Sequence, residues 1–78
     1  MHRLETVAAG STVRIAHMEG DAGTVRRVQE LGIAVGAIIR VVRKAPFNGP
    51  IEVAVGRTHI GLRPVHDVAI FVEPCEAV

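Results

Sequence analysis

The chain has 78 residues and a mass of 8.3 kDa, which predicts a single domain over residues 1–78, because chains split into domains of about 50 to 200 residues. Hydrophobic residues make up 49% and charged residues 22% of the sequence, a balance typical of a folded globular domain and not of a disordered segment. The formal net charge is +1 and the aromatic residues are two Phe, which makes nucleic acid an unexpected partner, since little attracts phosphates or stacks on bases.

The first expected element is a single helical turn at the N-terminus. Leu4 and Val7 lie three residues apart, and Gly10 follows them where such a turn would end. The first strand is expected over residues 12–18, where apolar side chains alternate with others. This alternation places His17 on the same face as the apolar residues of the strand.

One short amphipathic helix is expected next. Val25, Val28 and Leu31 recur every three residues, with polar side chains between them. Asp21 is a suitable N-cap, because its carboxylate accepts hydrogen bonds from the free N–H groups of the first turn. Gly32 stands where a left-handed residue commonly ends a helix.

Four further strands are expected after the helix, because turn residues recur at the spacing of short antiparallel strands. The apolar run in the first of them indicates contact on both faces, with the helix covering one. A Pro- and Gly-rich loop separates the first two, and Pro64 stops the fourth strand of the chain. Five strands and one helix predict a mainly β fold, a small five-stranded barrel that is closed or nearly closed. The four strands are residues 37–44, 51–55, 58–62 and 68–72.

Four segments of the chain combine glycines and apolar residues in a particular order and spacing. They are Leu4 and Val7 before Gly10; Arg27-Val28-Gln29-Glu30-Leu31-Gly32-Ile33 before Gly36; Ala45-Pro46-Phe47-Asn48-Gly49-Pro50-Ile51; and Ile60-Gly61-Leu62-Arg63 before Ile70 and Val72. Together they resemble the FeoA family of ferrous-iron transport accessory proteins, over nearly the whole chain. One departure is His66-Asp67, where the family tends to have an acidic and a small apolar residue, so the resemblance assigns no role to this turn.

The resemblance implies an SH3-like barrel in the cytoplasm that docks on the cytosolic part of a FeoB-type membrane transporter. An alternative implied by the same resemblance is a regulatory domain, because a similar barrel forms the C-terminal domain of some iron-dependent transcription repressors. The chain has no helix-turn-helix segment, which argues against repression by this chain alone. A weak homo-oligomer stays an open alternative.

The candidate partner-binding residues lie in the loop, on the helix and after the fourth strand. Phe47 in the loop either folds back over a barrel end or is displayed to a partner, since aromatic residues anchor many interfaces. The arginines of the helix serve either as a solvated face or as an interface rim, and Arg63 either pairs with an acid such as Glu52 or meets an acidic partner. The candidates are Pro46, Phe47, Asn48, Arg26, Arg27 and Arg63.

A metal or catalytic site is not expected. The four His and the single Cys75 show none of the spacings that mark metal sites, so no cofactor is required and weak transition-metal binding at surface histidines is the most we expect. Gly20 and Gly23 precede the helix, but the carboxylate of Asp21 would repel phosphate. A thin core leaves little room for a pocket of about 300 Å³, and the protein is predicted not to be an enzyme.

The sequence also bears on location. Its longest uncharged apolar stretch, residues 32–39, is far shorter than the ~20 residues of a membrane span. Residues 1–10 hold no apolar run typical of a secretory signal. A single cysteine forms no internal disulfide and fits a reducing compartment. We therefore expect a cytoplasmic protein without direct membrane insertion.

Overall fold

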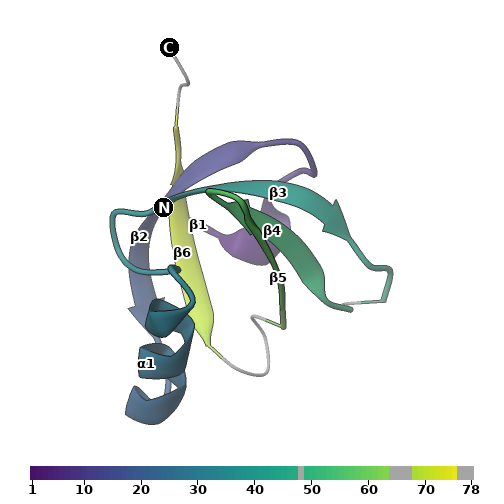
Figure 1. Cartoon of the computed structure of the whole chain (residues 1–78). Helices are drawn as coiled ribbons and strands as arrows, with labels where there is room; N and C mark the ends of the chain where they lie inside the picture. Colours follow the sequence, from purple (N-terminus) through teal and green to yellow (C-terminus); the bar gives the residue numbers. More distant parts are fainter. Residues whose placement is uncertain (48, 64–67, 76–78) are drawn as a thin grey trace.

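A computed structural model describes residues 1–47, 49–63 and 68–75. All strands are antiparallel and belong to one sheet in the order β1-β6-β2-β3-β4-β5. The sheet curls around a central space, with α1 and the β3–β4 loop at opposite ends (Figure 1). The elements are β1 (His2–Arg3), the 3₁₀ turn η1 (Leu4–Thr6), β2 (Thr12–Glu19), α1 (Ala22–Glu30), β3 (Ile38–Lys44), β4 (Ile51–Val55), β5 (Thr58–Leu62) and β6 (Ala69–Pro74).

The five predicted strands correspond to β2 through β6, and their ends differ by at most two residues from the prediction. The additional strand, β1, has two residues and pairs with β6. Two residues are too short for an alternating pattern, so the sequence carried no signal for β1. β1 and β5 are the two ends of the sheet and do not pair with each other in the described chain, which leaves the barrel unclosed.

Alternate side chains from β2 to β6 point inward and form the core. Burying such side chains is the main stabilising contribution in a domain of this size, about 1.5–3 kcal/mol for each large aliphatic group. The alternation predicted from the sequence is confirmed along most of each strand. The buried apolar residues are Leu4, Val13, Ile15, Val28, Ile33, Ile39, Val41, Ile51, Val53, Ile60, Leu62, Val68, Ile70 and Val72.

A β-bulge in β2 overturns the expectation for His17. β2 pairs with β6 through Ile15 and Val72, and then through His17 and Phe71, so Ala16 is an extra residue. An inserted residue reverses the side-chain alternation beyond it. The side chain of His17 is consequently 50% exposed, and the prediction that it shares the inner face with Ile15 is wrong.

The outer face of β3 is uncovered, contrary to expectation. Ile38 at the start of β3 is 51% exposed, and Val42 is only partly buried. The helix does not lie across β3, because α1 stands beyond the end of β2 (Figure 1). The apolar run of β3 therefore has one buried face, and the prediction of burial on both faces is wrong.

The predicted ends of the helix are confirmed. The Asp21 carboxylate accepts hydrogen bonds from the backbone N–H groups of Gly23 at 3.1 Å and Thr24 at 3.2 Å, as an N-cap does. Gly32 has φ +99°, the left-handed conformation that glycine adopts most readily. Val28 is buried in the core, whereas Leu31, just beyond the helix, is 49% exposed.

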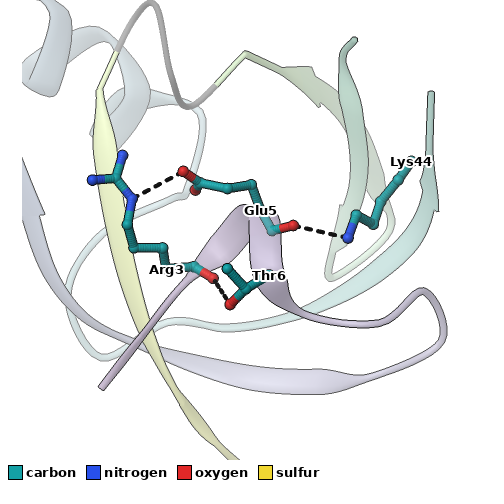
Figure 2. A network of polar contacts seen from close by, with 4 residues as sticks. All are labelled: Arg3, Glu5, Thr6 and Lys44. Carbon is teal, nitrogen blue, oxygen red and sulfur yellow. Dashed lines mark hydrogen bonds and ion pairs between the residues drawn. The ribbon is translucent and has the colours of Figure 1, made fainter. Parts of the chain in front are cut away.

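The N-terminal turn is attached to β3 by one lysine. Lys44 donates from Nζ to the carbonyl oxygens of Glu5 at 2.8 Å and Val7 at 3.0 Å. The Arg3 guanidinium pairs with the Glu5 carboxylate at 2.9 Å (Figure 2). Leu4 of the same turn is completely buried. The predicted N-terminal helical turn is thus confirmed as η1, which carries one side chain into the core.

Candidate interaction surface

Phe47 is the most exposed large apolar residue of the described chain. It lies in the β3–β4 loop with 98% of its surface exposed and a positive φ of 58°. The loop is closed by hydrogen bonds from the Ala45 N–H to the Pro50 carbonyl at 3.0 Å and from the Gly49 N–H to the Pro46 carbonyl at 3.2 Å. Phe47 does not fold back over a barrel end, so packing does not account for an aromatic residue here.

Glycine is required at one position of this loop. A Cβ atom on Gly49 would lie 2.7 Å from the Cβ of Ala45 and 3.1 Å from the Pro46 carbonyl oxygen. Real side chains do not approach so closely, so the tight loop that displays Phe47 depends on Gly49. The exposure of Phe47 therefore depends on a specific residue of the loop, Gly49.

A groove of about 470 Å³ adjoins the loop. A second groove, of about 340 Å³, lies beside β2 and β6. Both open at the surface, and their volumes exceed the room that we expected from the size of the core. That expectation is wrong because surface hollows between a loop and a sheet take no space from the core. Residues lining the first groove include Arg43, Ala45, Pro50, Glu52, His59 and Gly61.

Three charged or polar side chains form a cluster in the first groove. His59 Nδ1 lies 2.8 Å from Glu52 Oε2, and Arg43 Nε lies 3.1 Å from Glu52 Oε1. The hydrogen bond with His59 lowers the pKa of Glu52 below its ordinary value; desolvation opposes this in part, and the positive charge of Arg43 adds a smaller lowering effect. Glu52 is therefore ionised near neutral pH and fixes both neighbours.

Sequence reasoning did not identify Arg43 as part of this cluster. The register of β3 and β4 shifts between Val41 and Arg43, which marks an irregularity at Val42. The shift places Arg43 opposite Glu52, outside the barrel. No periodic signal reveals such a shift, although a charged residue two positions after a buried valine is a weak indication of one.

The predicted interface residues occupy separate regions of the surface. Arg26 and Arg27 are exposed on α1, and Pro46 is exposed in the β3–β4 loop. Arg63 is exposed directly after β5. Asn48 lies outside the described residues. Because α1 and the β3–β4 loop stand at opposite ends of the molecule (Figure 1), the arginines of α1 do not share one surface with Phe47.

Comparison with known families now places this fold. The family model described as FeoA domain matches residues 2–74. The chain belongs to the FeoA domain family. A comparison with curated proteins finds no matching relative.

Solved structures agree with this assignment. The solution structure of the FeoA protein from Chlorobium tepidum is similar to this FeoA domain with 27% identity and a TM-score of 0.85, over 95% of this chain and 70% of that one. Stenotrophomonas maltophilia FeoA complexed with zinc, described as a procaryotic SH3 domain protein, has 25% identity and a TM-score of 0.75, over 94% and 91%. The predicted SH3-like fold is thereby confirmed.

The same fold also occurs inside a larger regulator. A manganese-dependent transcriptional repressor has 26% identity and a TM-score of 0.81, over 95% of this chain and 41% of the repressor chain. This FeoA domain thus resembles a part of a metal-dependent repressor as well as separate FeoA proteins.

Side chains of the types that can bind a metal are dispersed in the part of this FeoA domain that the structure describes. There, no three side chains among His, Cys, Asp and Glu gather where one ion could be held. His17 lies 3.4 Å from Glu19, and His59 lies 2.8 Å from Glu52, so each has one carboxylate neighbour. A membrane-crossing length of apolar helix is likewise not found in the described residues.

Proposed function

We propose that this FeoA domain is a cytoplasmic accessory protein of ferrous-iron uptake, which acts by contact with the cytosolic part of a FeoB-type transporter and not by catalysis. The observation that carries the proposal is the 98% exposure of Phe47 at the tip of a loop. An aromatic side chain that packs on nothing in its own domain is suited to anchor a partner. Pro46 beside it is exposed as well.

Family membership supplies the biological context. The description of the Stenotrophomonas maltophilia protein connects it with activation of bacterial ferrous iron transport. The contact surface proposed for the present chain consists of Pro46, Phe47 and Asn48, with Arg63 near the adjoining strand. Arg26 and Arg27 of α1 form a separate rim at the other end of the molecule.

No cofactor is required in this proposal. The Stenotrophomonas maltophilia protein is complexed with zinc. For the present chain the proposal is weak binding of such an ion at surface histidines, since a stable structural site needs three or four converging ligands. In our chain, His17 with Glu19 and His59 with Glu52 are two-group sites of that weak kind.

The experiment is a binding measurement with the purified soluble GTP-binding domain of a FeoB-type transporter, in the nucleotide-free, GDP-bound and GTP-bound states. Phe47→Ala is expected to weaken binding about tenfold or more, the loss typical of an interface anchor. Val35→Ala is the matched control, because Val35 is also apolar and 61% exposed but lies in the α1–β3 connection. Equal binding by the wild type and a folded Phe47→Ala variant would overturn the assignment of the loop.

A second candidate function is a regulatory domain of the kind found in metal-dependent repressors. The observation in its favour is the repressor structure that this chain matches over 95% of its own length. This alternative predicts no binding to the transporter domain in any nucleotide state. The same measurement therefore separates the two functions.

A further inference from the structure

β5 is an edge strand with a regular free side. It forms five consecutive antiparallel pairs with β4, from Val55 and Thr58 to Ile51 and Leu62, without a bulge. Among the residues that the structure describes, no strand pairs with its other side. A regular strand with one unpaired side exposes a row of backbone donors and acceptors that another strand can join.

The hairpin geometry identifies the backbone groups that are free. Val55 and Thr58 flank a two-residue turn whose first residue, Gly56, has φ +59°, as in a type II′ hairpin. The pair that closes such a turn is hydrogen-bonded, and hydrogen-bonded pairs then alternate with non-bonded ones. The N–H and C=O groups of His59 and Gly61 consequently point away from β4, toward the free edge.

Common devices that block an edge are missing from β5. The opposite edge of the sheet, β1, has only two residues, and short edges offer little to pair with. β5 has five residues, Thr58–Leu62, with neither proline nor lysine among them. A Cβ on Gly61 would meet nothing within 4 Å, so the outer face of β5 is open at Gly61, beside the groove that His59 and Gly61 help to line.

The charges beside this edge are positive. Arg57 directly precedes β5 and Arg63 directly follows it, and both are exposed. They are six positions apart, with the five residues of β5 between them, which corresponds to about 20 Å along the strand direction. No ion pair joins either arginine to a carboxylate within residues 1–47, 49–63 and 68–75, and Glu52 is already engaged by Arg43 and His59.

These charges disfavour a second copy of this chain as the occupant. Two β5 strands pairing antiparallel about Ile60 would bring Arg57, in the turn before one strand, close to Arg63 after the other strand. Like charges brought close together at both ends of a strand pair disfavour the pairing. A strand with carboxylates at the same two positions would instead form two favourable pairs.

We propose that the free edge of β5 binds an extended acidic segment of a partner protein, which adds to the sheet as a strand and places two carboxylates, six residues apart, against Arg57 and Arg63. Backbone hydrogen bonds to His59 and Gly61 hold the segment, and the arginines select it by charge. The inference rests on the proposed function in that the chain acts by protein contact, and it names the chemistry of the contacted segment.

The test uses a synthetic peptide and does not involve the transporter. The probe is a capped nonapeptide of alternating Thr and Val with Glu at its second and eighth positions, titrated into ¹⁵N-labelled protein and followed by NMR. We expect saturable shift changes at Thr58–Leu62 and about tenfold slower hydrogen exchange at the His59 and Gly61 amides, because unpaired N–H groups become hydrogen-bonded. A peptide with Lys in place of both Glu residues is expected not to bind.

Matched variants separate strand addition from charge attraction. Gly61→Pro removes an edge N–H and is expected to weaken binding about tenfold, whereas Gly61→Ala keeps the N–H and binds as the wild type does. The double variant Arg57→Glu with Arg63→Glu is expected to lose binding of the Glu peptide and to bind the Lys peptide. If Gly61→Pro fails to fold, the double variant and the exchange measurement decide the question.

Each outcome has a defined meaning. Shift changes outside β5, unchanged exchange at His59 and Gly61, equal affinity of both peptides, or dimerisation of the free protein through β5 would overturn the proposal. If the peptide binds β5 and the transporter domain does not bind, the proposal of an edge site stands and the proposed function is overturned. If the transporter domain binds and the peptide does not, the proposed function stands and the edge site on β5 is overturned.

Discussion

Phe47 combines two properties that are both unfavourable for folding. A non-glycine residue with a positive φ pays about 1 kcal/mol or more relative to ordinary backbone, and a side chain that is 98% exposed gains nothing from burial in return. Stability therefore does not explain phenylalanine at this position. The proposed contact surface offers an explanation, since the side chain would be buried only when a partner is present.

Replacing Phe47 by glycine tests this account. We expect Phe47→Gly to leave the free energy of unfolding unchanged or to raise it by up to about 1 kcal/mol. Glycine adopts a positive φ without strain, which stabilises the fold, and its larger conformational entropy in the unfolded chain offsets part of this gain. Urea denaturation measures the change. Gly49→Ala in the same loop is the control and should destabilise, because its Cβ would lie 2.7 Å from that of Ala45. A loss above about 1 kcal/mol for Phe47→Gly would show that the phenyl ring packs.

The ionisation of Glu52 is the second test at the scale of residues. Its pKa lies below the ordinary 4.5, chiefly because of the hydrogen bond with His59 and then because of the charge of Arg43. We expect His59→Ala to raise this pKa toward the ordinary value. Arg43→Ala should raise it less. Carbon-detected NMR titration of the Glu52 carboxyl group measures both.

The pH dependence of stability follows from the lowered pKa of Glu52. A carboxyl group whose pKa is lower in the folded than in the unfolded chain stabilises the fold above its unfolded pKa, and this contribution disappears as the pH falls through the folded value. Stability attributable to Glu52 is therefore complete at neutral pH and decreases in acid, below about pH 4.5. An unchanged Glu52 pKa in His59→Ala would mean that the hydrogen bond is not the cause.

At the scale of elements, a single side chain, Lys44, joins η1 to β3, a strand about forty residues away along the chain. Lys44 Nζ donates to the carbonyl oxygen of Glu5 at 2.8 Å (Figure 2) and to that of Val7 at 3.0 Å. These carbonyls lie at and just after η1, where a 3₁₀ turn leaves acceptors without partners inside the turn. The lysine thereby closes the turn that places Leu4 in the core.

Lys44→Met removes this attachment while keeping most of the aliphatic stem. We expect the free energy of unfolding to fall by about 1.5 kcal/mol, the low end for hydrogen bonds of a charged group because the site is exposed. Arg40→Met is the matched control, since Arg40 is an exposed cation on the same strand, and it should change stability by less than about 0.5 kcal/mol. Equal effects of the two substitutions would show that the lysine contacts contribute nothing.

At the scale of the whole molecule, features with a local cause were predictable from the sequence. Asp21 and Gly32 bound the helix because capping depends on the residue itself, and the strands follow from alternation over four or more residues. The bulge at Ala16 and the shift near Val42 were not predictable, since inserting one residue into a strand leaves no periodic trace. These two irregularities decide that His17 and Arg43 face outward.

The surface was predicted less well than the core for the same reason. The sequence located the Pro- and Gly-rich loop but left the burial of Phe47 open, because burial depends on neighbours from other strands. The cluster around Glu52 depends on register between β3, β4 and β5. The separation of the α1 arginines from Phe47 depends on where the helix stands against the sheet, which local patterns do not fix.

Metal removal tests whether the molecule depends on its apolar core alone. In the described residues, His17 and His59 each have one carboxylate partner, and no three potential ligands gather, whereas a structural zinc site uses four. We therefore expect EDTA to leave the melting temperature unchanged, within about 1 °C, and excess zinc to raise it only slightly, since weak binding stabilises according to RT ln(1 + [L]/Kd). His59→Ala should reduce that rise if the ion binds beside Glu52. A fall of several degrees with EDTA would show that a bound metal contributes to the fold, because about 1 kcal/mol shifts the melting temperature of a domain of this size by 4–8 °C.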